Sequence, residues 1–213
     1  MKCLKLFVLL AATAVSHAMA AGDVDAGKEK SQPCAACHGA DGNSPSGEWP
    51  SLAGQGEKYL VEQIQAFKAG DRQNALMAPM VANLSEQDMA DLAAYFSAQA
   101  IKVGQADPEL AEQGERIYRG GVVAEGVPAC SGCHGPAGEG VDAAGFPALA
   151  GQHTQYLEIQ LKAFRAAGRG DLGDNVVKRT NDPQEMMRTV AAKMSDTEIK
   201  AVASFLSGLS TEE

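Results

Sequence analysis

The sequence predicts an all-α fold built from two similar halves. Apolar residues recur at helical spacing in segments 57–69 and 154–167, as expected for amphipathic helices. A second observation is an internal repeat, in which the tetrapeptide Leu-Ala-Gly-Gln at 52–55 returns at 149–152, 97 residues later. No alternating apolar and polar run of useful length predicts a strand. The chain therefore reads as two tandem helical domains.

The amino end has the pattern of a secretory signal peptide. Lys2 and Lys5 precede an apolar run from 6 to 15, and Ala18-Met19-Ala20 supplies the small residues of a cleavage site. The apolar run is shorter than the roughly 20 residues that a spanning helix needs, and no later stretch reaches that length. We expect cleavage after Ala20 and an exported chain with no transmembrane segment.

The amino-acid composition narrows the class of protein further. Hydrophobic residues make up 45% and charged residues 21%, which is typical of a soluble globular protein. The net charge is −9, and it becomes −11 once the signal peptide is removed, so nucleic acid is an unfavourable partner. Aromatic residues are only 5%, with Trp49 the single Trp, which is little for two cores. Something other than side chains is expected to fill part of the interior.

The pattern C-x-x-C-H occurs twice, at 34–38 and at 130–134. This spacing is the attachment signature of c-type haem, in which two thiols bond the porphyrin and the adjacent His is the proximal iron ligand. The prediction is two covalently bound haem c groups. The expected covalent anchors are Cys34, Cys37, Cys130 and Cys133, and the expected proximal ligands are His38 and His134.

Three other interpretations of the cysteines compete with haem attachment. An exported chain could hold two C-x-x-C disulfides. A four-thiolate zinc site would need two pairs closer together than the 96 residues that separate these. A thioredoxin-like dithiol would need a strand-and-helix context that is missing. None of the three accounts for a His directly after the second Cys in both pairs.

The repeat also selects the distal iron ligands, because haems used for electron transfer commonly take Met as the second axial ligand. Toward the end of each half the offset becomes 110, and at that offset only Met77 and Met187 fall in one column. They are the predicted distal ligands, with Met80 the alternative in the first half and Met186 the weaker alternative in the second. His153 has no counterpart in the first half and is expected to be a surface or loop residue.

The change of offset means that the second half carries 13 extra residues, around 170–185. This insertion is rich in Gly, Asp and Asn, and it is expected to be a surface loop. Before it, the offset of 97 pairs Tyr59 with Tyr156, Gln63 with Gln160, and Arg72 with Arg169.

The remaining helices follow from their end signals. Capping boxes at 85–88 and 195–198 open the last helix of each half. Shorter helices are expected before each motif, near 23–37 and 107–119, the second begun by Asp107-Pro108. The resulting organisation is a signal peptide at 1–20, a first domain at 21–98, a linker at 99–107 and a second domain at 108–213.

With these features the sequence resembles the dihaem cytochromes c, and most closely the cytochrome c4 family. The resemblance covers both motifs, the Gly-Gln turns at 54–55 and 151–152, the Tyr-Arg-Gly-Gly run at 118–121 and the distal Met positions. It implies two cytochrome c-type haem domains packed about a pseudo-twofold axis in an electron carrier of the bacterial periplasm. The implied partners are redox proteins, with a quinol-oxidising complex as donor and a membrane oxidase as acceptor, and peripheral membrane association is left open.

Two alternative functions remain at this point. A dihaem enzyme of peroxidase type would need one iron to open a coordination position, whereas an iron capped by Met has no vacant site for substrate. The electron-accepting subunit of a dehydrogenase would have the same haem chemistry and differ only in a permanent partner. The residues favour an electron carrier over an enzyme, since no acid, base or nucleophile cluster competes with the haem motifs.

Overall fold

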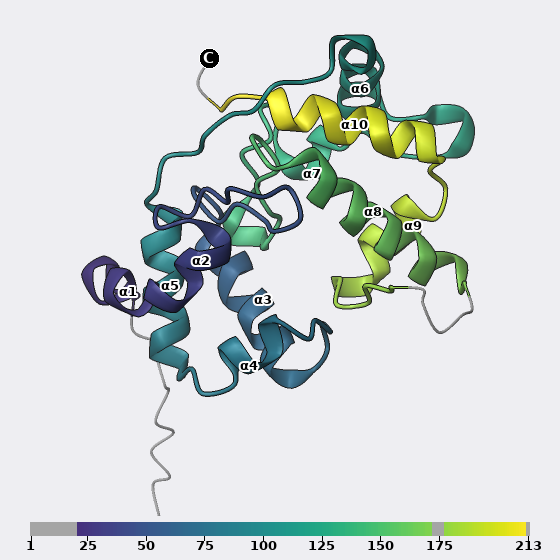
Figure 1. Ribbon diagram of the computed structural model, residues 1–213. Coiled ribbons are helices and arrows are strands. Elements are labelled where there is room, and N and C mark those ends of the chain that lie inside the picture. Colours follow the sequence, from purple (N-terminus) through teal and green to yellow (C-terminus); the bar gives the residue numbers. More distant parts are fainter. Residues whose placement is uncertain (1–20, 172–176, 212–213) are drawn as a thin grey trace, which may run out of the picture.

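The computed structural model describes residues 21–171 and 177–211, which fold into helices joined by loops (Figure 1). Within these ranges the β pairing is confined to two isolated antiparallel bridges, Val122–Val127 and Val141–Phe146. The α-helices are α1 (Val24–Lys30), α2 (Ala35–His38), α3 (Glu57–Ala69), α4 (Met77–Val81), α5 (Glu86–Ser97), α6 (Pro108–Gly120), α7 (Ser131–His134), α8 (Thr154–Arg169), α9 (Met186–Ala191) and α10 (Asp196–Gly208). Short 3₁₀ turns are η1 (Gln32–Cys34), η2 (Val123–Glu125), η3 (Asp142–Ala144) and η4 (Pro183–Glu185).

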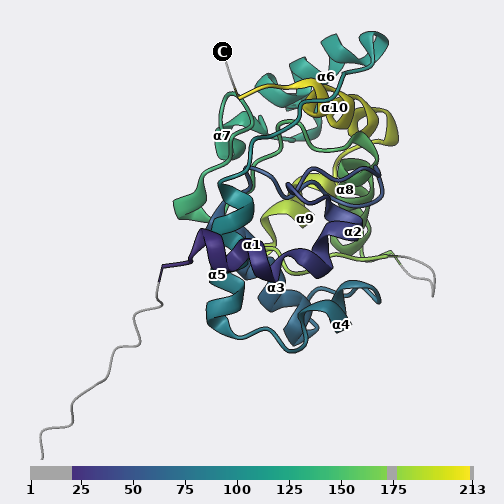
Figure 2. The same ribbon diagram turned by 60° about the vertical axis from the view of Figure 1, so that its left-hand side comes forward.

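Each half is closed by a crossing of its first and last helices. α1 packs on α5, and α6 packs on α10, as both views show (Figures 1 and 2). A glycine sits at each crossing: a Cβ on Gly27 would overlap the carbonyl of Asp91, and a Cβ on Gly114 would overlap the carbonyl of Ala201. The absence of side chains at these points lets the helix backbones touch. The all-α fold of two equivalent halves is therefore confirmed.

Most of the predicted helices have the expected bounds. α3 spans 57–69, and α8 runs two residues past its expected end, to Arg169. α6 begins at Pro108, where the Asp107 carboxylate accepts a hydrogen bond from the Glu109 amide. Both capping boxes are present, at 85–88 and at 195–198. Local sequence signals thus placed these five helices.

The segment near 23–37 is more broken than a helix before the motif would be. α1 ends at Lys30, a 3₁₀ turn follows, and α2 begins only at Ala35. Pro33 accounts for the break, because it has no amide hydrogen to continue the helical hydrogen bonding. As a result the first attachment motif stands on a separate short helix.

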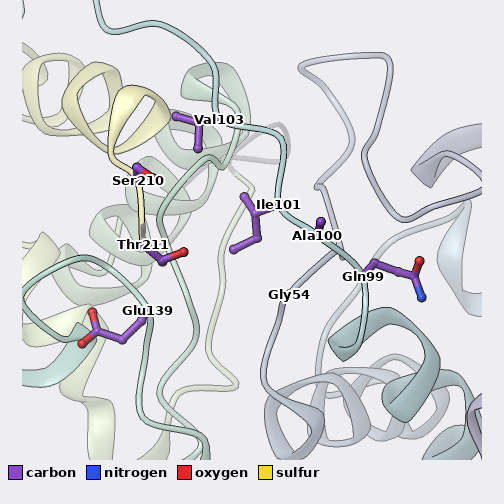
Figure 3. Close-up of a pocket in the computed structure, with 8 residues that line it drawn as sticks. All are labelled: Gly54, Gln99, Ala100, Ile101, Val103, Glu139, Ser210 and Thr211. Carbon is purple, nitrogen blue, oxygen red and sulfur yellow. The ribbon is translucent and has the colours of Figure 1, made fainter. Parts of the chain in front are cut away.

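The linker between α5 and α6 is wedged into the junction of the halves. A Cβ on Gly54 or on Gly151 would collide with the side chain of Ile101, and both glycines have positive φ, 65° and 67°. Ile101 therefore occupies the space left by two equivalent turns, one from each half. Beside it lies a hollow of about 360 Å³ between the linker and the chain end (Figure 3), lined by Gly54, Gln99, Ala100, Ile101, Val103, Glu139, Ser210 and Thr211.

The insertion in the second half begins earlier than the offset implied. The Arg72 amide donates to the Ala66 carbonyl, and its guanidinium lies 4.6 Å over the Phe67 ring. Arg179 makes the same pair of contacts, with Ala163 and Phe164. The pairing of Arg72 with Arg169 was wrong, since Arg169 belongs to α8 and donates to the carbonyls of Ala192 and Met194.

The expected surface loop at 170–185 is only partly such a loop. Residues 172–176 lie outside the described residues, as do the predicted signal peptide at 1–20 and residues 212–213. Val177 and Lys178 are exposed, but Arg179 and Asp182 are buried. The insertion thus delivers a charged side chain to the interior. No helix in the described part of the chain combines the length and the hydropathy needed to cross a membrane.

Candidate functional site

The two attachment motifs stand on equivalent short helices. Cys34 caps α2 and Cys130 caps α7, so the second Cys lies one turn further on and the His one residue beyond it. Each helix ends directly after the His at a glycine with positive φ, 79° at Gly39 and 82° at Gly135. Two thiols and one imidazole are thereby presented from a single helical turn in each half.

The hydrogen bond on each imidazole fixes which nitrogen is available for iron. Nδ1 of His38 lies 2.8 Å from the Pro50 carbonyl oxygen, and Nδ1 of His134 lies 2.9 Å from the Pro147 carbonyl oxygen. A carbonyl only accepts, so Nδ1 carries the proton and donates in both cases. In the neutral ring Nε2 is then the nitrogen with a lone pair, as a metal ligand requires.

Burial keeps both rings neutral. It lowers the pKa of His38 and His134 below the ordinary value, although the carbonyl hydrogen bonds act in the opposite direction. Both side chains are only 7% exposed. The rings therefore lie inside the protein in the protonation state that binds iron.

The cysteines match thioether anchors better than they match the alternatives. None of the four is in a disulfide. Burial raises the pKa of the Cys34 thiol, and it raises that of Cys130 to about 11, whereas a redox-active dithiol needs a lowered value. In the described residues no three His, Cys, Asp or Glu side chains gather as a metal site, so the two pairs do not form a zinc centre.

The apolar surroundings also suit a large flat cofactor. In the first half the buried cluster is small, and Cys34 packs against it. In the second half the cluster is larger, and Cys130 packs against it. The members of the first cluster are Leu60, Leu92, Ala93, Tyr95 and Phe96, and those of the second include Ile117, Tyr118, Leu157, Met194, Ile199, Val202 and Leu206.

The predicted distal ligands occupy equivalent places in short helices. Met77 is the first residue of α4, and Met187 is the second residue of α9. Both are half-buried, whereas the alternatives Met80 and Met186 are 45% and 38% exposed. The assignment of Met77 and Met187 to iron remains a prediction.

His153 is not a simple surface residue. It caps α8 and reaches across to the other half, where its Nε2 lies 2.9 Å from the carbonyl oxygen of Ser44. Its ring is half-buried at the junction of the halves. The repeat could not indicate this contact, because the first half has Gly56 at the equivalent position.

One set of residues that sequence reasoning missed lies between the two halves. Gln55 donates from Nε2 to the Ala148 carbonyl at 3.0 Å and accepts from the Ala148 amide at 2.8 Å. Gln152 makes the same two bonds with Ser51, at 2.9 and 3.0 Å. The signal was visible as the repeated Gly-Gln turn, but it carried no information about the partner.

A second missed set joins α3 to α8. Arg72 reaches Tyr156 and Gln160 of the second half, and Arg179 reaches Tyr59 and Gln63 of the first. The recurrence of Tyr59 and Gln63 as Tyr156 and Gln160 in the repeat was the available signal. The role of these residues becomes clear only from the packing of the two halves against each other.

These features define a c-type haem protein with one site in each half. The donor set, two thiols and a neutral imidazole held by a single turn, fits covalent haem c at both places.

Comparison with known proteins agrees. The family model described as Cytochrome c matches residues 24–99 and 111–210. Cytochrome c4 of Pseudomonas aeruginosa is 48% identical over 204 residues, covering 96% of each chain. The crystal structure of reduced recombinant cytochrome c4 from Pseudomonas stutzeri has a TM-score of 0.82 at 48% identity, covering 89% of this chain and 100% of that one. A protein named thiosulfate dehydrogenase electron acceptor, from Thiomonas intermedia, is 39% identical over 81% of this chain and 76% of its own.

The chain belongs to the cytochrome c4 family, and it is a dihaem electron-transfer cytochrome with two covalently bound haem c groups.

Proposed function

We propose that this cytochrome carries electrons between redox proteins of a bacterial respiratory chain. It would accept them from a quinol-oxidising complex and deliver them to a membrane cytochrome oxidase. The observation that carries the proposal is the equivalence of the two sites, because each half supplies its own thiols, its own neutral imidazole and a Met in the same column. A bound haem c supplies one-electron exchange at its iron.

The residues have separate roles in this proposal. Cys34, Cys37, Cys130 and Cys133 anchor the two haems covalently. His38 and His134 would each supply an imidazole ligand to one iron, and the carbonyls of Pro50 and Pro147 hold the two rings in orientation. Met77 and Met187 would supply the second protein ligand of each iron, which would leave no coordination position for a substrate.

The first experiment is an absorption spectrum of the reduced protein with and without carbon monoxide. An unchanged spectrum is expected, because both irons would already have six ligands. A shift of one haem's bands would mean an open position and would favour a peroxidase-like dihaem enzyme over a carrier.

A second candidate is the electron-accepting partner of a dehydrogenase. The relative named thiosulfate dehydrogenase electron acceptor favours it. Purification from native membranes and soluble extract separates the two functions, because a permanent partner would copurify in fixed ratio and a shuttle would not. The purified cytochrome can also be mixed with the soluble extract and thiosulfate. Its reduction under these conditions would support the second candidate directly.

We further propose that residues 1–20 are removed during export and that the mature protein works in the periplasm. Amino-terminal sequencing of the purified holoprotein is the test, with Ala21 expected as the first residue. Residues 21–213 carry a net charge of −11, so electron transfer with a basic partner should slow as salt is added.

A further inference from the structure

The junction of the two halves contains two guanidinium groups without an acidic partner, of which Arg179 is buried and Arg72 half-buried. Arg179 is 8% exposed, and no carboxylate of the described residues forms an ion pair with it or with Arg72. We call this group of side chains the arginine cluster. It consists of the guanidiniums of Arg72 and Arg179 and the four side chains that accept hydrogen bonds from them, Tyr59, Gln63, Tyr156 and Gln160.

The arginine cluster has more donors than acceptors. Oε1 of Gln63 accepts from Arg72 at 2.9 Å, from Arg179 at 2.8 Å and from Asn181 at 2.9 Å. Oε1 of Gln160 accepts from both guanidiniums, at 3.0 and 2.8 Å. Two neutral amide oxygens thus serve five donated hydrogen bonds, most of them from positive charges. Buried arginines are ordinarily paired with carboxylates or phosphates.

The pKa of the Tyr59 phenol reflects the surplus positive charge. Burial by itself would raise the pKa of Tyr59, but the nearby charges of Arg179 and Arg72 outweigh it and lower that pKa below the ordinary value. A phenol drawn toward its anion is a sign that the surroundings favour negative charge. The net charge of the chain is −9, whereas the arginine cluster is locally positive.

In the sequence, the two arginines of the cluster lie close to the predicted distal ligands. Arg72 comes five residues before Met77, and Arg179 comes eight residues before Met187. Each guanidinium bonds to helices of both halves, α3 and α8. An anion received here would therefore be shared between the two halves.

We propose that Arg72 and Arg179 are positioning residues for carboxylate anions, that these anions are the propionate groups of the two haems, and that the pair sets both reduction potentials together. Each haem c brings two carboxylates, which are the negative charges missing from the cluster. A positive charge near a haem stabilises the reduced iron relative to the oxidised iron, so it raises the potential. This inference requires the two bound haems and does not depend on which redox partner the protein serves.

The test is a redox titration of the two-haem holoprotein, followed optically and resolved into two components. In Arg72→Gln both midpoint potentials should shift to lower values, because each haem loses part of a shared positive charge. Arg179→Gln should do the same. A shift of only one component in either variant would overturn the shared role, and no shift would overturn the whole proposal.

Two controls separate charge from loosening of the junction. Gln55→Ala removes two hydrogen bonds between the halves without changing any charge, and both potentials should stay at their wild-type values. If Gln55→Ala lowered them as Arg72→Gln does, the effect would be structural and the proposal would fail. Arg72→Lys and Arg179→Lys keep the charge and should retain most of each potential, which keeps the test decisive should the Gln variants not bind two haems. If the Lys variants lowered the midpoint potentials as much as the Gln variants do, the charge would not be the cause and the proposal would fail.

A final arm distinguishes haem propionates from a free anion. Wild-type protein is titrated with sodium phosphate at constant ionic strength. Both potentials should be independent of phosphate, because the haem carboxylates occupy the cluster. A saturable shift with phosphate would mean that the cluster takes a free anion and would overturn the propionate assignment.

Discussion

Met77 and Met80 lie three positions apart in one short helix, yet only one of them can bind the first iron. The repeat and the lower exposure of its side chain favour Met77. In Met77→Leu, carbon monoxide should bind to about half of the haem, since one of the two irons would lose its distal ligand. Optical titration with carbon monoxide measures this.

Met80→Leu is the matched control, and it should leave both irons closed to carbon monoxide. If instead Met80→Leu opens an iron and Met77→Leu does not, the distal ligand of the first half is Met80.

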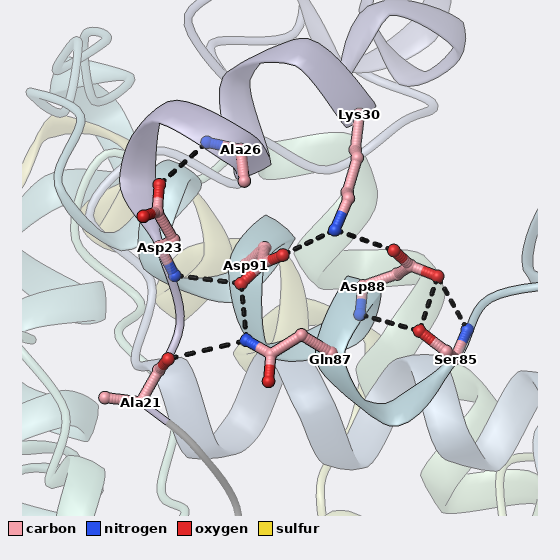
Figure 4. A network of polar contacts seen from close by, with 8 residues as sticks. All are labelled: Ala21, Asp23, Ala26, Lys30, Ser85, Gln87, Asp88 and Asp91. Atoms are coloured by element: carbon pink, nitrogen blue, oxygen red, sulfur yellow. Dashed lines mark hydrogen bonds and ion pairs between the residues drawn. The ribbon is translucent and has the colours of Figure 1, made fainter.

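Asp91 is the buried acid of the first half. Its carboxylate accepts from Lys30 at 2.5 Å, from the Asp23 amide at 2.9 Å and from Gln87 at 2.8 Å (Figure 4). The Lys30 ammonium, and after it the Asp23 amide and Gln87, hold the pKa of this carboxyl below its usual value. Asp91→Asn should lower the free energy of unfolding by about 1–3 kcal/mol at neutral pH, because Lys30 and the amide lose a charged acceptor.

The pH dependence of that loss has a definite sign. A depressed carboxyl pKa stabilises the fold above the unfolded value of 3.8, and the stabilisation disappears as the pH falls through the folded value. The difference between wild type and Asp91→Asn should therefore shrink below about pH 4, as measured by denaturant titration at a series of pH values. Asp41→Asn is the control: Lys102 lowers the pKa of Asp41 to about 2, but both side chains are exposed to solvent, so about 0–1 kcal/mol is expected.

At the scale of the helix, Gly114 tests how closely α6 and α10 must approach. Gly114→Ala would press a methyl group on the carbonyl of Ala201, and the free energy of unfolding should fall by about 1–3 kcal/mol. Gly120, in the same helix, has open space around it, so Gly120→Ala should be neutral or should raise stability by up to about 1 kcal/mol. Thermal unfolding of the two holoproteins compares them, and equal losses would contradict a close crossing at Gly114.

The helices and the attachment motifs were predictable because their signals are local. Ser85 and Ser195 reveal their capping boxes within four residues, and each Cys pair reveals its His in the next residue. Arg179 was not predictable, because the insertion shifted it out of the column of Arg72. The role of Gln55 was hidden for a different reason: its partner, Ala148, offers only backbone atoms, which leave no mark on a sequence.

At the scale of the molecule, the Gln55 and Gln152 bridges should make the halves unfold together. Gln55→Ala with Gln152→Ala removes four hydrogen bonds, equivalent to about 2–4 kcal/mol of coupling between the halves. Calorimetry should then resolve two transitions where the wild type has one. Gln65 in α3 is exposed, so Gln65→Ala should leave a single transition. Two transitions already present in the wild type would mean that the bridges do not couple the halves.

The bridges have the form of a contact between two copies of one protein. Gln55 meets the backbone of Ala148, Gln152 meets that of Ser51, and each pair maps onto the other under the repeat. Such self-complementary contacts are those of a twofold dimer. Here the segment between α5 and α6 joins the two halves, so their association is intramolecular and does not weaken on dilution. The two redox centres therefore stay together in one molecule at any concentration. Because the halves are not identical copies, the sequence of each can change independently of the other.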